Sequence, residues 1–287
     1  MQHNRNIFRE LLGDPWLSGR LTDEMQALLK GQAWLLERKG NVNAHAFLLQ
    51  ALHYKETALL DYALNGASLH TGFYFAAAAL HYLLLLEQAE VLEMPMEFIG
   101  DGRQMAWDVD PVKHPELFKQ DRSIFNSRQS LEMMACALLG SRPQEAGQIA
   151  AMGEESQEEI YLLQPSSIST MAEHHLFYAV KAFYRSGNVA VRQHLDSIQQ
   201  NDTITSMAAQ ALYALLEKDR IHFLSALEGQ LQLQEQLFTE EQRDIPYFIC
   251  SAAVITAALA LQEGLVTKDS LPQHNNFFPL QLLAAAG

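Results

Sequence analysis

Apolar residues recur at spacings of three and four along almost the whole chain, and sustained apolar–polar alternation is almost absent. The first pattern marks one face of an α-helix, whereas alternation would indicate strands. We therefore predict an all-α fold, a bundle of about ten to twelve helices with hairpin-like repeats and no sheet. The expected helices include residues 21–39, 43–64, 69–87, 131–139, 171–184, 204–216, 221–235 and 246–263.

The same spacing predicts which residues form the core. The helix at 69–87 is apolar on nearly every face, so it should be buried centrally. Leu83, Leu84, Leu212 and Cys250 are expected to be buried. The helix that begins near residue 21 should bury one stripe, formed by Leu21, Met25, Leu28, Leu29, Leu35 and Leu36.

Residues from about 95 to 114 interrupt the helical pattern. Gly100-Asp101-Gly102 and Asp108-Val109-Asp110-Pro111 have the composition of turns. We predict a long functional loop here, or a subdomain joint at about 99–114, within a single α-helical domain that spans residues 1–287. The stretches that begin at Gln50-Ala51-Leu52 and Gln210-Ala211-Leu212 resemble each other, but no fixed repeat period follows, so a regular solenoid is not expected.

Composition and charge narrow the function. Of 287 residues, 48% are hydrophobic and 19% charged, which is enough apolar material for a packed core. The 34 acidic residues outnumber the 20 basic ones, giving a formal net charge of −14. Binding to nucleic acids or to anionic membranes is therefore not expected, because both rest on Lys and Arg. A basic protein is the natural partner of such a chain.

The sequence favours a cytoplasmic protein. Its first ten residues lack the apolar stretch of a secretory signal, and the apolar runs at 73–86 and 247–261 are shorter than the roughly 20 residues that span a bilayer. Both runs are expected to be core helices. Cys136 and Cys250 lie in apolar helical segments and are expected to be free, buried thiols.

No sequence motif of catalysis is found, so we predict that the chain is not an enzyme and holds no cofactor or metal. Gly-x-Ser-x-Gly, the phosphate-binding loops, His-Glu-x-x-His and Glu-x-x-His are all absent. Asp108-Val109-Asp110 matches a short metal-binding pattern, but it is read as a solvated turn. His53, His81 and the Glu173-His174-His175 stretch are read as structural.

The C-terminal half suggests a family. Phe223-Leu224-Ser225-Ala226-Leu227 lies on an amphipathic helix, and Ala257-Ala258-Leu259-Ala260-Leu261 precedes Gly264-Leu265 and then Phe277-Phe278-Pro279-Leu280-Gln281-Leu282-Leu283. This order resembles the immunity protein 49 family of bacterial polymorphic-toxin systems, as does Ala58-Leu59-Leu60-Asp61-Tyr62-Ala63-Leu64 ahead of Gly66. The resemblance, which covers about two-thirds of the chain loosely, implies an all-helical antitoxin that binds and neutralises a cognate toxin. It carries over no catalytic or toxin-binding residues.

Two acidic segments are the predicted toxin contacts: Asp101, Asp108 and Asp110 in the loop, and Glu154, Glu155, Glu158 and Glu159 in a polar stretch. A basic nuclease-type toxin would suit such a surface. The simplest reading of the second segment is a solvated helix face, with an electrostatic recognition patch as the alternative. Two other functions stay open, a helical scaffold or regulator that binds peptides in a groove, and a helical enzyme with an unrecognised site.

Overall fold

The computed structural model describes residues 6–37, 44–90, 95–100, 103–108, 127–152, 170–185, 187–201, 203–241 and 243–283. Within these residues eleven α-helices form, so the predicted all-α multi-helix bundle is confirmed. The helices are α1 (Ile7–Leu12), α2 (Asp14–Glu37), α3 (Ala44–Asn65), α4 (Leu69–Glu90), α6 (Ser127–Leu139), α7 (Pro143–Ala151), α9 (Met171–Tyr184), α10 (Asn188–Asp196), α11 (Ile204–Leu216), α12 (Arg220–Gln236) and α13 (Ser251–Gln262).

Short irregular helices complete the C-terminal part. A π-helical turn, Leu237–Glu241, continues α12, and 3₁₀ turns occur at Ile245–Phe248 and Lys268–Ser270. Gly264 ends the α13 segment, as the sequence predicted, and its φ of 68° lies in the left-handed region that glycine adopts at little cost.

The expectation of no sheet does not hold between residues 95 and 108. Strands β1 (Pro95–Gly100) and β2 (Arg103–Asp108) pair as an antiparallel hairpin, with Met96 opposite Trp107 and Phe98 opposite Met105. The sequence between them is Asp101-Gly102, a dipeptide that favours two-residue hairpin turns. The apolar residues on both sides of it, such as Phe98, Ile99 and Trp107, are types that favour strands, although strict alternation is lacking.

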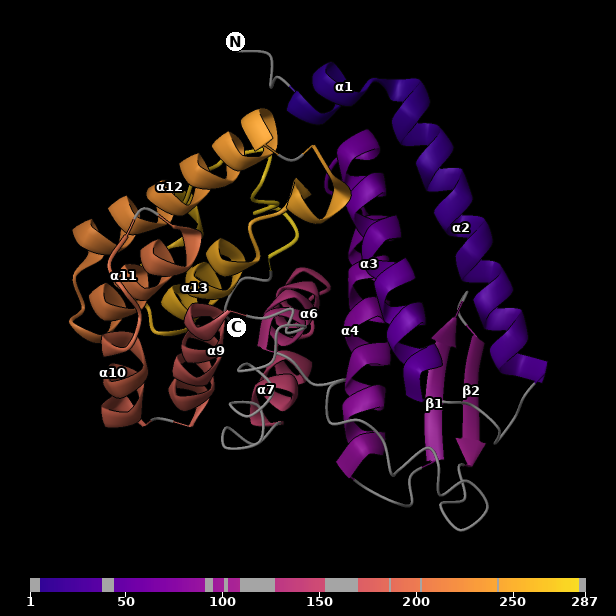
Figure 1. The fold of residues 1–287 in the computed structure, drawn as a ribbon, viewed down its shortest axis with the longest axis horizontal. Coiled ribbons are helices and arrows are strands. Elements are labelled where there is room, and N and C mark those ends of the chain that lie inside the picture. Colours follow the sequence, from indigo (N-terminus) through magenta and orange to yellow (C-terminus); the bar gives the residue numbers. More distant parts are fainter. Residues whose placement is uncertain are drawn as a thin grey trace.

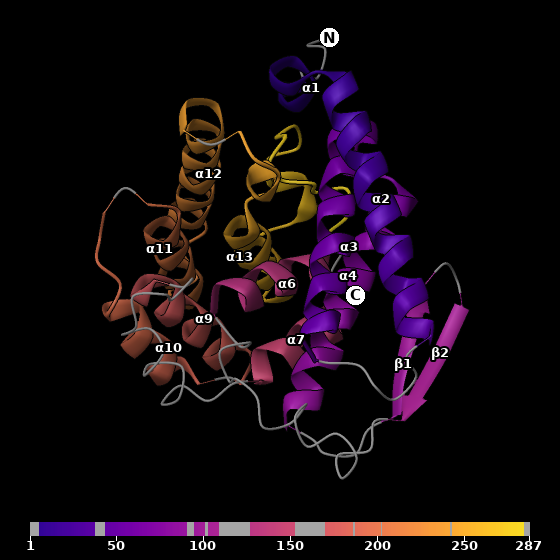
Figure 2. The same ribbon diagram turned by 45° about the vertical axis from the view of Figure 1, so that its right-hand side comes forward.

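The helices fall into two groups joined by a central pair. Helices α1 to α4 form one side of the molecule, α9 to α13 form the other, and α6 and α7 lie between them (Figure 1). The turned view keeps α6 between α4 and α13, and both neighbours contact it directly (Figure 2). Consecutive helices pack as hairpins, most extensively α3 with α4, α11 with α12 and α2 with α3.

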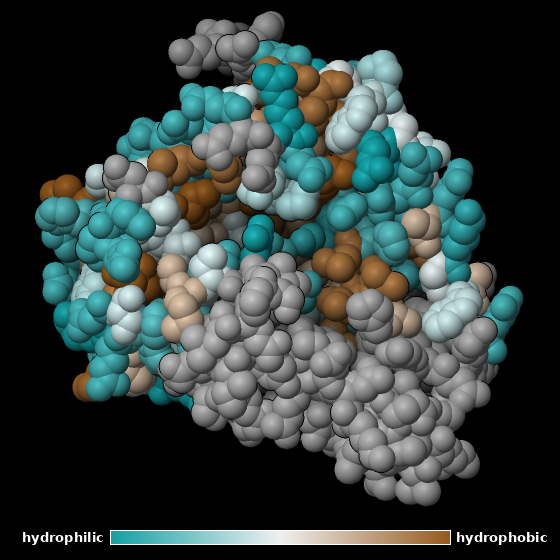
Figure 3. All heavy atoms as spheres, in the orientation of Figure 1, coloured by the Kyte–Doolittle hydropathy of each residue, from teal (hydrophilic) through white to brown (hydrophobic). Residues whose placement is uncertain are grey.

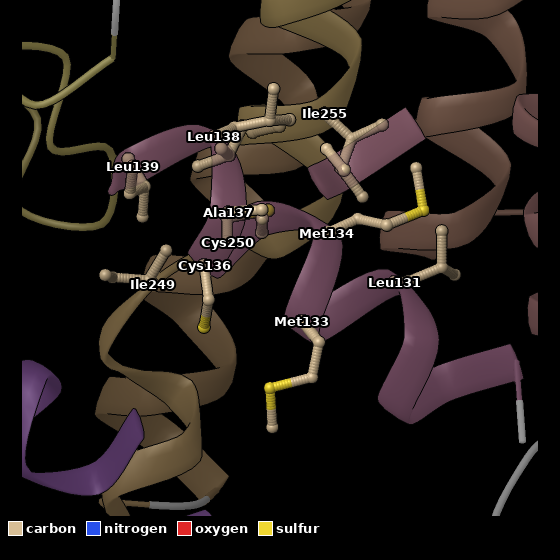
Figure 4. Packing of buried hydrophobic residues seen from close by; sticks show 14 of the residues in the cluster. Leu131, Met133, Met134, Cys136, Ala137, Leu138, Leu139, Ile249, Cys250 and Ile255 are labelled. Carbon is tan, nitrogen blue, oxygen red and sulfur yellow. The ribbon is translucent and has the colours of Figure 1, made fainter. Parts of the chain in front are cut away.

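Helix α6 lies in the middle of the core, and α4, the helix expected to be buried centrally, packs on it with many buried residues of its own. The labelled side chains leave α6 on several sides and meet Ile249, Cys250 and Ile255 from the start of α13 (Figure 4). Leu83, Leu84, Leu212 and Cys250 are all buried, so the four predicted core residues are confirmed. Cys136 and Cys250 are free and buried, also as predicted, and burial raises the pKa of each thiol to about 12.

Gly140, directly after α6, permits a close approach to α4. A Cβ atom at this position would lie 2.5 Å from the backbone nitrogen of Ala76, closer than any side chain tolerates. Glycine is therefore required here for space, and α4 and α6 are held backbone against backbone at this point.

An aromatic cluster joins the first helix to the last part of the chain. The Phe8 ring stacks on Phe248 at 4.6 Å between centroids and meets Phe238 and Phe277 edge-on at 5.4 and 5.3 Å. All four rings are almost fully buried. Such pairs stabilise by about 0.5–1.5 kcal/mol beyond their burial, so α1 is fixed by residues distant in sequence.

The prediction for α2 is right about the helix and only partly right about its buried stripe. Leu28 is buried and Leu21 packs partly buried against the core, whereas Met25 and Leu29 are 41% and 50% exposed. The side chains of Leu35 and Leu36 lie outside the described part of the structure, and the other described buried residues of α2 are Leu17 and Glu24. Glu24 is turned inward because it has partners on α3: its Oε2 lies 2.8 Å from His53 Nδ1. The buried face is thus set by a polar contact that apolar spacing does not report.

Two segments have the length and composition of membrane spans, Leu69–Leu86 in α4 and Ile245–Gln262, which includes α13. In each, 61% of the window is buried inside the structure. Core helices pass the same test of length and composition, and both segments contribute many residues to the hydrophobic core.

Candidate functional site

The predicted toxin-contact residues lie almost entirely outside the described part of the chain. Asp101, Asp110, Glu154, Glu155, Glu158 and Glu159 are not among the described residues. Asp108 is the last residue of β2, and its backbone pairs with Pro95. Both acidic segments therefore remain predictions.

The described surface offers a different candidate, an open groove between α11 and α12 with a volume of about 640 Å³. The two helices lie side by side in both views (Figures 1 and 2). They are joined by a tight turn in which Lys218 has a φ of 58° and Asp219 caps α12. The groove is lined by Met207, Gln210, Tyr213, Ala214, Glu217, Asp219, His222, Ser225, Ala226, Glu228, Gly229 and Gln232.

Small residues let the two helices approach and form the floor of the groove. Ala214 and Ala226 are buried there. Further along, a Cβ on Gly229 would lie only 3.1 Å from the sulfur of Met207, so α12 passes very close to α11 at this level. Met207 is only partly covered and faces the groove.

The charged lining residues are acidic: Glu217, Asp219 and Glu228, with no Lys or Arg among them. The Nη1 atom of Arg192, on α10, lies 3.5 Å from Oε1 of Glu217, and the Glu217 side chain stays more than half exposed. Asp219 accepts hydrogen bonds from the backbone amide and the ring of His222, which hold the pKa of its carboxyl below the usual range. Within the described residues Glu228 has no ion pair or hydrogen bond.

Tyr213 contributes a protonated phenol to the same groove. Its hydroxyl donates a hydrogen bond to Asp196, and burial together with this carboxylate raises the pKa of Tyr213 to about 12. The groove thus presents carboxylates and amides above a floor of small residues, which suits a ligand with positive charge and modest apolar side chains.

A second polar group lies in the interior, where Lys55 of α3 meets Glu132 of α6 at 2.6 Å and Arg128 lies 3.4 Å from the same carboxylate. Burial alone would raise the pKa of Glu132, but the two cations outweigh it and lower that pKa. Burial likewise opposes the charge on Lys55, and Glu132 more than restores it, raising the pKa of Lys55. Both partners stay ionised, and the adjoining cavity of about 20 Å³ has room for roughly one water molecule. This arrangement is a structural ion pair.

The histidines discussed above occupy defined structural positions. His81 is buried, its Nδ1 donates to the carbonyl of Ala77 at 2.7 Å, and burial lowers its pKa to about 4. Glu173, in the Glu-His-His stretch, is part of a capping box with Thr170 at the start of α9. Within the described residues no three or more His, Cys, Asp or Glu side chains are placed to hold a metal ion.

Sequence reasoning found the two helices that form the groove but not the groove. The predicted segments 204–216 and 221–235 match α11 and α12 closely. Which faces of consecutive helices turn toward solvent depends on their packing against α13 and α9, and no local pattern specifies this.

Apolar residues are separated by hydrophilic ones over much of the described surface on the face seen in Figure 3.

No family model, no curated protein and no solved structure matches this chain.

Proposed function

We propose that this protein is an immunity protein, an antitoxin that binds a cognate bacterial toxin in the cytoplasm and neutralises it by direct contact, without catalysing a reaction. The observation that carries the proposal is the formal net charge of −14 in a chain without a catalytic sequence motif. The C-terminal sequence pattern, which resembles immunity protein 49, supports the same function. A basic toxin, such as a nuclease whose active site holds phosphate, is the partner class that fits this charge.

The physical basis of the proposal is electrostatic steering. Opposite fields on two proteins raise the association rate to about 10⁸–10⁹ M⁻¹s⁻¹ at low salt, compared with about 10⁵–10⁶ M⁻¹s⁻¹ for neutral pairs. An antitoxin gains from fast capture, because toxin that stays free acts on the cell. Salt screens exposed charges beyond about 8 Å at physiological ionic strength, so the advantage should fall as salt is raised.

A scaffold or regulator that binds peptides is the second candidate, and the α11–α12 groove favours it. Such a protein would bind many segments of similar chemistry with modest affinity. An immunity protein would bind one toxin tightly and abolish its activity, so the two functions are separated by specificity and inhibition.

Protection is the decisive measurement. Cells that express the product of the neighbouring toxin gene should survive when this chain is co-expressed and should die without it. Toxicity that persists despite abundant, folded protein would refute the immunity function.

Binding kinetics then test the two predicted acidic segments. Lys substitutions at Asp101, Asp108 and Asp110, or at Glu154, Glu155, Glu158 and Glu159, should slow association with that toxin at low salt and matter less at high salt. Unchanged association after substitution of both segments would exclude them as steering surfaces and would leave the immunity function standing.

A further inference from the structure

We infer that the groove between α11 and α12 is a docking site for a positively charged helical segment of the partner protein. The inference rests on the proposed function, since it names the surface and the chemistry through which the partner is held. The spacing of the lining residues, the small residues of the floor and the charge of the walls support it.

The lining residues form two parallel rows with the spacing of helix faces. Eight of the twelve lining residues form these rows: positions 207, 210, 214 and 217 on α11 and its C-cap, and positions 222, 225, 229 and 232 on α12. Each row therefore follows steps of three, four and three residues, and at 1.5 Å per residue each extends about 15 Å, nearly three turns. A third helix packs into such a groove through its own side chains at i, i+3, i+4 and i+7.

The floor suits side chains that insert from above. Ala214, Ala226 and Gly229 have small side chains, so the floor lies low between the more exposed residues of the walls. Met207 is only partly covered and presents apolar surface to the groove. A partner helix with small or aliphatic residues on one face would bury these groups.

Charge selects the partner's other residues. Glu217, Asp219 and Glu228 line the groove without a lining Lys or Arg. Of the nearby cations, Arg192 is paired with Glu217, Lys218 is paired with Glu263, and Arg220 lies at the start of α12. A second copy of this chain would bring the same net charge of −14, whereas a Lys- or Arg-rich helix complements the walls.

The test uses two synthetic 18-residue helical peptides with the same leucines at i, i+3, i+4 and i+7. In one peptide the remaining positions are mainly Lys, and in the other they are mainly Glu. Fluorescence anisotropy with the full chain should show binding of the Lys peptide and at least about tenfold weaker binding of the Glu peptide. Raising the salt concentration should weaken binding of the Lys peptide, because salt screens the charges on both partners.

Three variants of the protein locate the binding. Ser225→Trp fills the groove without changing its charge, and Glu228→Lys reverses the charge of one residue in its wall. Each variant should bind the Lys peptide about tenfold more weakly, or weaker still. Asp23→Lys is the matched control, because Asp23 is exposed on α2, on the other side of the molecule, and should leave binding nearly unchanged. If Ser225→Trp fails to fold by circular dichroism, Gln232→Trp replaces it, since Gln232 is exposed at the end of the same row.

Several results would overturn the inference. One is peptide binding that survives a folded Trp variant, and another is an equal loss in Asp23→Lys and Glu228→Lys, which would mean general charge attraction. A dimer in light scattering that dissociates in the Trp variant would assign the groove to a second copy of the chain.

The protection assay separates this inference from the proposed function. Groove variants that still protect cells from the toxin would refute the groove as the toxin site and leave the immunity function intact. Failure of the unaltered chain to protect would refute the immunity function, whereas the peptide measurements would still decide what the groove binds.

Discussion

Helices α6 and α2 differ in how much of their surface is buried by neighbouring helices. In α6, ten of thirteen residues are buried, including the whole run from Met133 to Leu139. In α2, with 24 residues, the described buried residues are Leu17, Glu24 and Leu28, and four of its large apolar residues are exposed. Helix α6 is surrounded by α4, α7, α9 and α13, whereas α2 packs mainly on α3.

The difference shows what apolar spacing reports. A helix buried on every side needs apolar residues at almost every position, so its sequence alone identifies it. A helix at the edge needs only a narrow stripe, and a polar contact such as Glu24 with His53 can rotate that stripe by one position. The buried residues of α6 can therefore be predicted from its sequence, whereas those of α2 depend on its contacts with α3.

The largest test of this comparison is a pair of leucine deletions. Leu139→Ala in α6 should lower the free energy of unfolding by about 2–5 kcal/mol, because Leu139 is 1% exposed and leaves a cavity. Leu29→Ala in α2 should cost less than about 0.5 kcal/mol, because Leu29 is 50% exposed. Denaturant unfolding measures both, and similar losses would show that α2 is buried more deeply than described.

A pair of glycines gives effects of opposite sign. Gly140→Ala should destabilise by about 1–3 kcal/mol, because the new Cβ would collide with the backbone of α4 at Ala76. Gly19→Ala, within α2, should stabilise by about 0.5–1 kcal/mol, since nothing lies within 4 Å and alanine favours the helix. Thermal unfolding of the two variants is the measurement, and a stabilised Gly140→Ala protein would contradict the close contact between α4 and α6.

The smallest effect concerns a carboxyl pair at the α2–α3 interface. Burial and the neighbouring Glu24 carboxylate raise the pKa of Glu56. The folded protein thus holds this proton more tightly than the unfolded chain, so Glu56 contributes stability at low pH that is lost as pH rises through the raised pKa. Glu56→Gln should be slightly more stable than the unaltered protein at neutral pH, and the gain should vanish in acid. A pH series of denaturant midpoints tests this, and a gain that grows toward low pH would reverse the sign.

The core, the hairpin at 95–108 and the groove differ in how well the sequence predicts them. The core residues Leu83, Leu84, Leu212 and Cys250 were predictable, because each sits in a run that is apolar over several turns. The hairpin at 95–108 has an Asp-Gly dipeptide at its turn, but its flanks do not alternate strictly, and the turn composition suggested a loop. The groove was beyond reach, since it depends on how α11 and α12 are oriented by α9 and α13.

Phe8 has a consequence for how the protein is made. Its ring meets Tyr62 of α3 edge-on, and it is also buried among Phe238, Phe248 and Phe277, so α1 needs the last part of the chain to complete its packing. Phe277 is added about 270 residues after Phe8, and at about 5–20 residues per second the ribosome takes roughly 13–54 s to cover that distance. During this interval the Phe8 ring can contact Tyr62 of α3 but not Phe277. The aromatic cluster around Phe8 is therefore complete only after Phe277 has been synthesised.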